Sequence, residues 1–399
     1  MKIAVVGLGA VGVQVLWNLS QTADVEAVGY DSLYPGHPFA GAGGESRLYR
    51  NFELSDLSFM PIIRRADELW QTLEQACGRS LLRRTGVLLL GGSDNQQMKH
   101  ALKSSEETDK PYELLSYSDL GSQFPQFSLG STDMGMWDVE GGLISPELTI
   151  ASTAHLATEN GATIHENSRI RRIESRDDGV RVHADNSFKD YDRIVVACGG
   201  WTPTLLPELK TEVVVKRLTS AWFLGRNEHS LSRLPPFMRT APTYCYGTPT
   251  LDGQSVKLGL GFNDHLNVGD PDEVSRELSG QEAMDEIGRF DWIVRDLLPS
   301  LMPKPIRMNT YLESYTRSMH EYIRFHPQDS NIAVLTGFSG HGFKVSPALG
   351  EIGAQMITAG TTELDIEFLR EAPPEFSITD INTGQTSHNS LVSSREARN

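Results

Sequence analysis

Short apolar runs separated by glycine and polar residues recur along most of this chain. The first run, residues 2–6 (KIAVV), is followed by a stretch with helical spacing of its apolar residues, and a second apolar run covers residues 25–30. Short apolar runs bounded by turn residues are typical of buried strands, and apolar residues three and four apart are typical of a helix. The start of the chain is therefore predicted to form a strand, a helix and a second strand.

A glycine triplet lies between the first predicted strand and the helix. Gly7, Gly9 and Gly12 form the pattern G-x-G-x-x-G, and Asp31 ends the second apolar run. Gly7 permits a tight turn, Gly9 lets the backbone approach phosphates, and Gly12 lets the helix pack closely on the strand. The N-terminus of the helix offers N–H groups and a positive dipole end to an anion. With Asp31 placed to bind ribose hydroxyls, this order predicts a dinucleotide site, either for NAD or for FAD.

The remaining pattern predicts a nucleotide-binding fold that is interrupted by a second domain. Helical spacing recurs in residues 61–77, 146–160 and 347–358, and strand-like runs occur at 86–91, 162–165, 179–183, 193–200 and 332–337. Residues 216–311 alternate short apolar segments with turns, as in a mixed antiparallel sheet. We expect an α/β protein whose Rossmann-like domain takes residues 1–84, 146–213 and 322–374, and whose second domain, with a mixed, largely antiparallel sheet, takes 85–145 and 214–321. Residues 382–399, rich in Ser, Thr and Asn, predict a disordered tail.

Composition narrows the classes of function. A length of 399 residues favours two domains, and no apolar run is long enough to span a bilayer. The first strand belongs to the predicted nucleotide fold rather than to a signal peptide, so we expect a cytoplasmic protein without a membrane partner. The net charge of −16 argues against nucleic-acid binding. Cys77, Cys198 and Cys245 are too few and too scattered for a disulfide framework or a zinc site, and no metal is expected.

Further segments resemble those of a known family. In order, they are GESRLYR (44–50), RTGVL (84–88), CGGW (198–201) with LLPEL (205–209), VKLG (256–259), and GFSGHGFK (337–344) with Gly350-Glu351. With the glycine triplet and Asp31, they resemble the monomeric sarcosine oxidase and N-methyltryptophan oxidase family of flavin amine oxidases, within the D-amino-acid-oxidase-like superfamily. The resemblance covers about residues 1–370, and GFSGHGFK is its most specific element.

The resemblance implies a cofactor and a reaction. The dinucleotide would be FAD, and the Rossmann-like domain an FAD-binding domain. The expected reaction oxidises a C–N bond of a secondary or N-substituted amino acid, or a related amine, by hydride transfer to flavin N5, after which O2 reoxidises the flavin and yields H2O2. A monomer is expected. The implied cofactor-binding residues are Gly7, Gly9, Gly12, Asp31, Gly44, Ser46, Arg47, Ile170, Gly199, Gly200, Trp201, Gly340, His341, Gly342, Phe343 and Lys344.

The implied catalytic residues are Lys257, Arg47, Arg50, Lys344, Tyr315 and Tyr246. By resemblance, Arg50 and Lys344 clamp the substrate carboxylate. Lys257 lies near flavin N5, where a fixed cation favours negative charge developing on O2. Arg47 lies close to the flavin, and the two tyrosines line the substrate pocket. Without the resemblance, a lone lysine in a strand is usually solvent-exposed, the two arginines could be a solvated pair after a glycine-rich loop, and the two tyrosines could equally be core aromatics.

The chain departs from the family where relatives bind FAD covalently. They carry a cysteine just before the segment that matches Ser314–Arg317, and the position here is Glu313. No cysteine follows Cys245, so we predict a non-covalent FAD. A histidyl link through His37 is the alternative.

The substrate pocket also departs from the family, because two places that carry histidine in relatives lack it. One is now Ala42-Gly43 and the other lies within residues 257–261 (KLGLG). These smaller residues predict a roomier or differently polar pocket and a bulkier amine than sarcosine.

Three other functions stay open at this point. One is a flavin dehydrogenase with another electron acceptor, or an oxidase of a non-amino-acid substrate. Another is a flavin-binding sensor or scaffold without turnover, against which the combination of Arg50, Lys257 and Lys344 counts. The third is a nicotinamide dehydrogenase, supported only by the glycine triplet.

Overall fold

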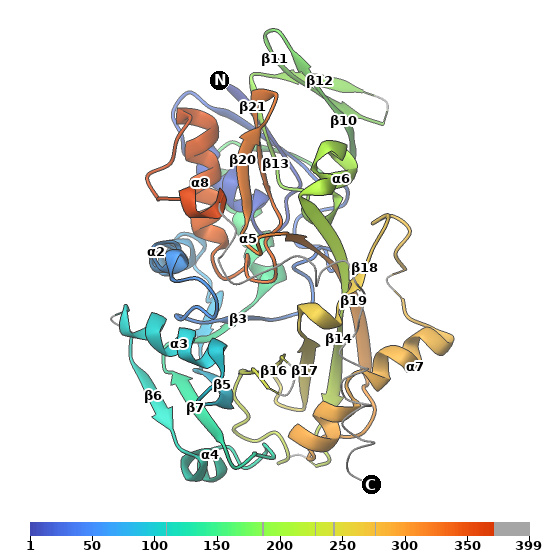
Figure 1. Ribbon diagram of the computed structural model, residues 1–399. Coiled ribbons are helices and arrows are strands. Elements are labelled where there is room, and N and C mark those ends of the chain that lie inside the picture. The colour runs from blue at the N-terminus through green and yellow to red at the C-terminus, as the bar shows by residue number, and fades with distance from the viewer. Residues whose placement is uncertain (109, 186, 228, 242–243, 276, 371–399) are drawn as a thin grey trace.

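The computed structural model describes residues 1–370, apart from residues 109, 186, 228, 242–243 and 276. The predicted tail, 382–399, lies outside the described residues. Two large sheets divide the molecule into an upper and a lower half in the view of Figure 1. Among the described helices, none combines the length and the apolar character of a membrane span. In the same part of the chain, no group of three or more His, Cys, Asp or Glu side chains is placed to hold a metal ion.

The upper half is built on a six-stranded sheet with the order β20-β21-β13-β1-β2-β9. All neighbours are parallel except β20 and β21, which are antiparallel. The first strand of the chain lies at the centre, beside strands that come from much later residues. The strands are β1 (Lys2–Val6), β2 (Glu26–Tyr30), β9 (Thr163–His165), β13 (Arg193–Val196), β20 (Tyr322–His326) and β21 (Asp329–Thr336).

The side chains of β1 point alternately to the two faces of this sheet, and this alternation explains the layers that cover it. Ile3 and Val5 are buried in one cluster with residues of the helices, whereas Ala4 and Val6 are buried in another cluster beneath a small sheet. Successive side chains of a strand point to opposite faces, so each face of the sheet needs its own cover. The helices are α1 (Gly12–Ser20), α2 (Met60–Cys77), α5 (Pro146–Glu159) and α8 (Ser346–Ala359), and the small sheet contains β10 (Ile170–Arg176), β11 (Gly179–Ala184) and β12 (Phe188–Tyr191).

The lower half contains a nine-stranded mixed sheet. Its order is β18-β14-β17-β16-β15-β5-β7-β6, and β19 also pairs with β14. Its strands are β5 (Val87–Gly92), β6 (Tyr112–Leu115), β7 (Asp133–Asp138), β14 (Val213–Leu224), β15 (Phe237–Arg239), β16 (Cys245–Pro249), β17 (Ser255–Leu260), β18 (Leu266–Asn267) and β19 (Arg307–Thr316). This half also carries α3 (Gln96–Glu106), α4 (Tyr117–Gln123) and α7 (Gly280–Gly288), while the short α6 (Thr202–Leu205) follows β13. The predicted α/β fold with an interrupted nucleotide-binding domain is confirmed, whereas the domain boundaries stay a prediction.

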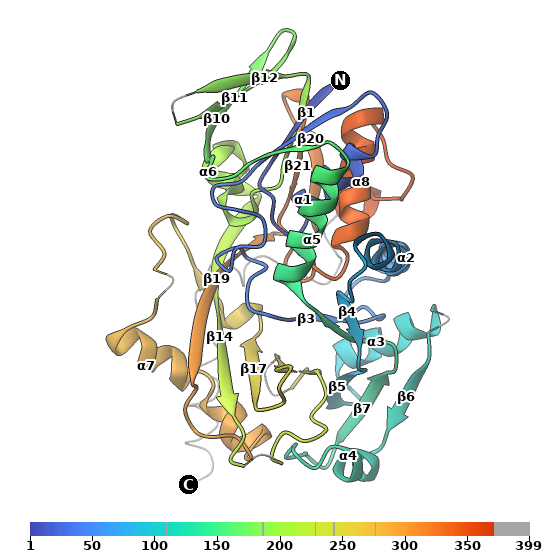
Figure 2. The same ribbon diagram turned by 180° about the vertical axis from the view of Figure 1, so that it is seen from behind.

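Two connections bring the halves together (Figure 2). A small sheet of β3 (Arg47–Tyr49), β8 (Gly142–Ile144) and β4 (Leu82–Arg84) lies between them. The C-terminal end of β19 reaches the turn that follows β21, where Tyr315 pairs with Phe338 and the Ser339 N–H donates to the Ser314 carbonyl at 3.1 Å. Residues of both sheets therefore meet at this junction.

Candidate cofactor and substrate site

The glycine triplet forms a tight turn between β1 and α1. Gly7 has φ +90°, and a Cβ atom there would lie 2.6 Å from the Ala197 carbonyl oxygen. A Cβ on Gly12 would lie 1.8 Å from the Gly7 carbonyl oxygen, so neither position accommodates a side chain. A Cβ on Gly9, in contrast, would meet no described atom within 4 Å. The turn is therefore closed on the protein side and open on the side where an anion can approach the helix N-terminus.

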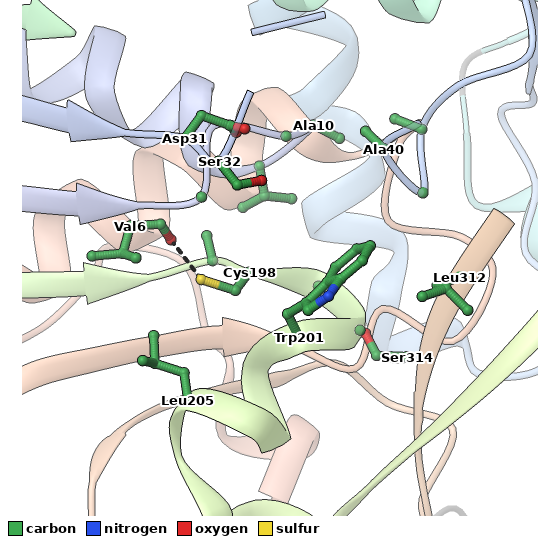
Figure 3. A pocket seen from close by; sticks show the side chains of 18 of the residues that line it. Val6, Ala10, Asp31, Ser32, Ala40, Cys198, Trp201, Leu205, Leu312 and Ser314 are labelled. Carbon is green, nitrogen blue, oxygen red and sulfur yellow. Dashed lines mark hydrogen bonds between the residues drawn. The ribbon is translucent and has the colours of Figure 1, made fainter. Parts of the chain in front are cut away.

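A cavity of about 440 Å³ begins at this turn, which is within the usual range for ligand pockets. Figure 3 shows Asp31 and Ser32 on one side of it, and Leu312 and Ser314 of β19 on the other. A cavity of this size, lined by the glycine turn, by Asp31 and by residues of β19, fits a dinucleotide site. The predicted cofactor residues that line it are Gly7, Gly9, Asp31, Arg47, Ile170, Gly199, Gly200, Trp201, Gly340, Gly342 and Phe343.

The other predicted cofactor residues are placed differently. Gly12 packs beneath the turn, and His341 and Lys344 do not line the cavity, although Gly342 and Phe343 between them do. Gly44 and Ser46 present backbone carbonyls to a lysine. Their roles toward a cofactor stay predictions.

Asp31 is fixed as a carboxylate at the phosphate end of the cavity. Its oxygens accept hydrogen bonds from the Leu8 N–H at 2.9 Å and the Leu33 N–H at 3.0 Å, and His37 Nε2 lies 3.6 Å away. Burial alone would raise its pKa, but the His37 hydrogen bond and the two N–H groups outweigh this effect and lower the pKa. The position suits the predicted contact with ribose hydroxyls.

Lys257 lies behind the loop that carries Arg47. Its side chain is only 2% exposed, and Nζ donates to the carbonyls of Gly44, at 2.9 Å, and Ser46. The Arg47 guanidinium, which lines the cavity, donates to the carbonyls of Ser46 at 2.9 Å and Gly41 at 2.8 Å. Burial, and then the neighbouring Arg47 charge, lowers the pKa of Lys257 well below its usual value. The two cations thus share one loop, and Lys257 itself does not border the cavity.

Arg50 and Lys344 share one buried counter-ion that the sequence analysis did not single out. Lys344 Nζ lies 2.8 Å from Glu53 Oε2, and Arg50 Nη1 lies 3.3 Å from the same atom. Burial would raise the pKa of Glu53, but Arg50 and Lys344 hold it well below its usual value. Burial, and then Arg50, lowers the pKa of Lys344 to about 8. Below that pH the three residues together carry one net positive charge, and their role as a clamp for a carboxylate stays a prediction.

Tyr315 is buried and Tyr246 is half-buried in the sheet of the lower half. Tyr246 forms a side-chain hydrogen bond with Ser220, and burial raises its pKa. Tyr315 Oη lies 3.0 Å from Glu313 Oε2 and 2.8 Å from His265 Nδ1. Burial, followed by the Glu313 charge, raises the pKa of Tyr315 well above its usual value. Neither tyrosine borders the cavity, so their predicted place in a substrate pocket stays a prediction.

Three further acidic or basic residues support this site and were missed by the sequence analysis. Glu147 accepts the Gly44 N–H at 2.7 Å, and buried Glu321 lies 3.0 Å from His341 Nδ1. His265 contacts Tyr315 as described above. The missed Glu53 offers one local signal, its spacing of three residues from Arg50, whereas the other contacts join residues far apart in the chain.

Comparisons with known proteins agree with this geometry. The family model described as FAD dependent oxidoreductase matches residues 2–356. Monomeric sarcosine oxidase of Streptomyces avermitilis is 28% identical over 370 residues, which are 90% of this chain and 94% of that protein. N-methyl-L-tryptophan oxidase of Salmonella typhi is 27% identical over 367 residues, 91% of this chain and 96% of that protein.

A solved structure gives the same fold. NikD, described as an unusual amino acid oxidase essential for nikkomycin biosynthesis, superposes with a TM-score of 0.80 at 23% identity, over 93% of this chain and 96% of its own. The predicted family resemblance is confirmed, and with it the prediction of FAD over a nicotinamide cofactor. The chain belongs to the family of FAD dependent oxidoreductases.

Proposed function

We propose that this protein is an oxidase of secondary or N-substituted amino acids, or of related amines, that uses non-covalently bound FAD and O2. The observation that carries the proposal is the buried cluster of Arg50, Lys344 and Glu53. A single carboxylate held by two cations leaves one positive charge, which a substrate carboxylate neutralises. FAD bound in the cavity would supply the acceptor for the two electrons of the oxidation. A cytoplasmic monomer stays our prediction from the sequence.

In this mechanism, Arg50 offers a planar fork and Lys344 a point charge to the substrate carboxylate, so the C–N bond is held in a fixed orientation. Arg47 places a cation on the cavity wall, where it would stabilise negative charge on a cofactor bound in the cavity. Lys257, held by two carbonyls behind the same loop, supplies the cation for negative charge that develops on O2. Burial lowers the pKa of Lys257, but negative charge that develops nearby favours the protonated lysine, and no water screens the two charges from each other.

The cysteines support non-covalent binding. Cys198 borders the cavity beside the phosphate turn, and its thiol donates to the Val6 carbonyl (Figure 3). Burial raises the pKa of Cys198 and that of Cys245 to about 12, which leaves both as thiols rather than reactive thiolates. His37 lies beside Asp31, the predicted ribose contact, and this position counts against a histidyl link to the flavin ring. Glu313 occupies the wall where relatives are expected to carry their linking cysteine.

The positions of the predicted substrate pocket that lack the histidine of relatives favour a substrate other than sarcosine. A Cβ on Gly261 would lie 2.9 Å from the Tyr244 ring, and a Cβ on Gly259 would lie 2.1 Å from the Tyr246 ring. The two tyrosines therefore occupy the space beside these glycines. The missing histidine is replaced by phenol groups rather than by free volume, so of the two predicted outcomes we favour a differently polar pocket.

The test is an H2O2-coupled screen of N-methyl, cyclic and sugar-modified amino acids with the purified holoenzyme. For an active substrate, Arg50→Ala and Lys344→Ala should raise KM about tenfold or more, because each removes a charge-assisted hydrogen bond to the carboxylate. Lys110→Met is the control, since Lys110 pairs with Asp67 and Glu140 away from the cavity. Unaltered KM in both cluster variants would remove the clamp.

Acid precipitation tests the mode of cofactor binding. The account expects all the yellow colour to pass into the supernatant when the holoenzyme is denatured in acid. Flavin that stays with the precipitated protein would establish a covalent bond instead.

A further inference from the structure

Three side chains form a continuous hydrogen-bonded path that leads away from the cavity. Glu313 borders the cavity, and its Oε2 lies 3.0 Å from Tyr315 Oη. Tyr315 Oη lies 2.8 Å from His265 Nδ1, and His265 Nε2 lies 3.1 Å from the Leu260 carbonyl oxygen. Residues 313 and 315 are two positions apart on β19, so their side chains lie on the same face of the sheet. His265 directly precedes β18, an edge strand, and is partly exposed.

Counting protons shows that this path holds one movable proton. A backbone carbonyl only accepts hydrogen bonds, so His265 Nε2 carries a proton toward Leu260. Tyr315 has one hydroxyl proton to satisfy two contacts, one with Glu313 and one with His265 Nδ1. A second proton must therefore reside either on the Glu313 carboxyl or on His265 Nδ1. The two arrangements differ only by a shift of two protons through the Tyr315 hydroxyl.

The surroundings decide which end holds this proton. Burial raises the pKa of Glu313, although the Tyr315 hydroxyl, the nearby charges of Arg47 and His341 and the Gly340 N–H act in the opposite direction. Burial lowers the pKa of His265 to about 3, and the charges of Lys216 and Arg289 add to this effect. Tyr244 and Tyr246 are the other titratable groups near Tyr315. Of the two arrangements, burial favours the one without charges, in which Glu313 is protonated and His265 is neutral.

We propose that Glu313, Tyr315 and His265 form a proton relay. The relay supplies the cofactor cavity with a proton from the edge of the nine-stranded sheet. Glu313 gives its carboxyl proton to a group in the cavity, and the Tyr315 hydroxyl then donates to the resulting carboxylate. His265, whose Nδ1 is now without a donor, takes up a proton from solvent, to which the residue is partly exposed. A shift of two protons through Tyr315 restores the resting arrangement, so one proton passes from water to the cavity.

The relay would supply a proton for the oxidase reaction, and this role rests on the oxidase function proposed above. Reduction of O2 to H2O2 by one hydride equivalent consumes one further proton. A neutral carboxylic acid on the cavity wall can supply that proton, whereas Lys257, held by two carbonyls, supplies charge. Glu313 is thus a proton donor to the cavity, and Tyr315 and His265 act through it as positioning residues.

Spectroscopy of the resting holoenzyme tests the proton positions without turnover. In protein labelled with ¹⁵N-histidine, NMR should show His265, assigned through His265→Gln, as a neutral ring protonated on Nε2 at neutral pH. Infrared difference spectra of wild type and Glu313→Gln should show the loss of one protonated carboxyl band. The His265 tautomer should survive in Glu313→Gln, because the amide N–H replaces the carboxyl O–H as donor to Tyr315. A ring protonated on Nδ1, or the absence of the carboxyl band, would overturn the proposal.

Reoxidation of the photoreduced holoenzyme by O2 tests the use of the relay. Glu313→Gln and Tyr315→Phe should each slow reoxidation about fivefold or more at alkaline pH, where free protons are scarce. Tyr191→Phe is the control, since it removes another buried hydroxyl contact, with Tyr30, outside the relay. Wild-type rates in both relay variants would overturn the relay alone. A wild-type enzyme that O2 does not reoxidise would refute the oxidase function, while the spectra still decide where the relay proton lies.

Discussion

The titration of Lys344 predicts how pH controls binding of a carboxylate ligand. Lys344 lies 2.8 Å from Glu53, and burial with the Arg50 charge lowers its pKa to about 8. Below pH 8 the lysine is charged and the cluster attracts an anion. Above pH 8 the lysine loses its proton, so the remaining charges of Arg50 and Glu53 cancel. Affinity for a carboxylate should therefore be full below the pKa and fall as pH rises through it.

The size of the effect follows from the pKa. If only the protonated form of Lys344 binds the carboxylate, the apparent Kd rises about tenfold between pH 7 and pH 9, which is about 1.4 kcal/mol. Between pH 6 and pH 7 it should hardly change. A lysine with an ordinary pKa would show no change anywhere in this range.

Acetate is a suitable ligand for this assay, because its own charge is constant over the range and it carries no amine. Its Kd is measured from the change in the flavin absorption spectrum of the holoenzyme at each pH. Lys344→Arg should bind acetate without this pH dependence, because arginine stays charged. Lys344→Met should bind weakly at every pH. A Kd in wild type that stays constant from pH 7 to pH 9 would refute the assignment of Lys344 as a titrating part of the clamp.

Four other substitutions test three separate parts of the account. Lys257→Met should slow reoxidation of the reduced holoenzyme by O2 several hundred-fold, a loss of about 3–4 kcal/mol, and an unchanged rate in stopped-flow mixing would discard its role. Glu53→Gln leaves two buried cations without their counter-ion and should lower the free energy of unfolding in urea by about 3–5 kcal/mol, so a loss below about 1 kcal/mol would contradict the buried pairing. Gly12→Ala forces a Cβ to within 1.8 Å of the Gly7 carbonyl oxygen and should yield protein without flavin, whereas Gly9→Ala should fold and bind FAD more weakly. Equal flavin content in the two glycine variants would show that the turn tolerates both.

The parts of the fold that were predictable are those with strong local patterns. β1, α1 and β2 have buried apolar residues at strand or helix spacing, and so do α2, α5 and α8. In contrast, α3 was not predicted, because its buried side chains are only Met98, Ala101, Ser104 and Ser105. Small and polar residues that pack against a sheet leave no hydrophobic periodicity in the sequence. The same holds for the pairing of β14 with β19, which joins strands about a hundred residues apart.

In the candidate site, too, the local parts were predictable from the sequence and the long-range contacts were not. The glycine turn and Asp31 form a local unit, so their spacing along the chain was sufficient to place them at one end of a cavity. Glu53 escaped notice because its partner Lys344 lies 291 residues away, and only the folded chain brings the two together. His265 was missed for a similar reason, since its contact with Tyr315 depends on the pairing of both β18 and β19 with β14. Contacts between residues so far apart cannot be predicted from local sequence patterns.

Anaerobic mixing of the purified holoenzyme with N-methyl and cyclic amino acids tests the central claim most directly. The account predicts that at least one of these amino acids bleaches the flavin absorption bands, and that admission of air restores them with one H2O2 formed per flavin. A holoenzyme whose flavin is never bleached by an amine that carries a carboxylate would contradict the account.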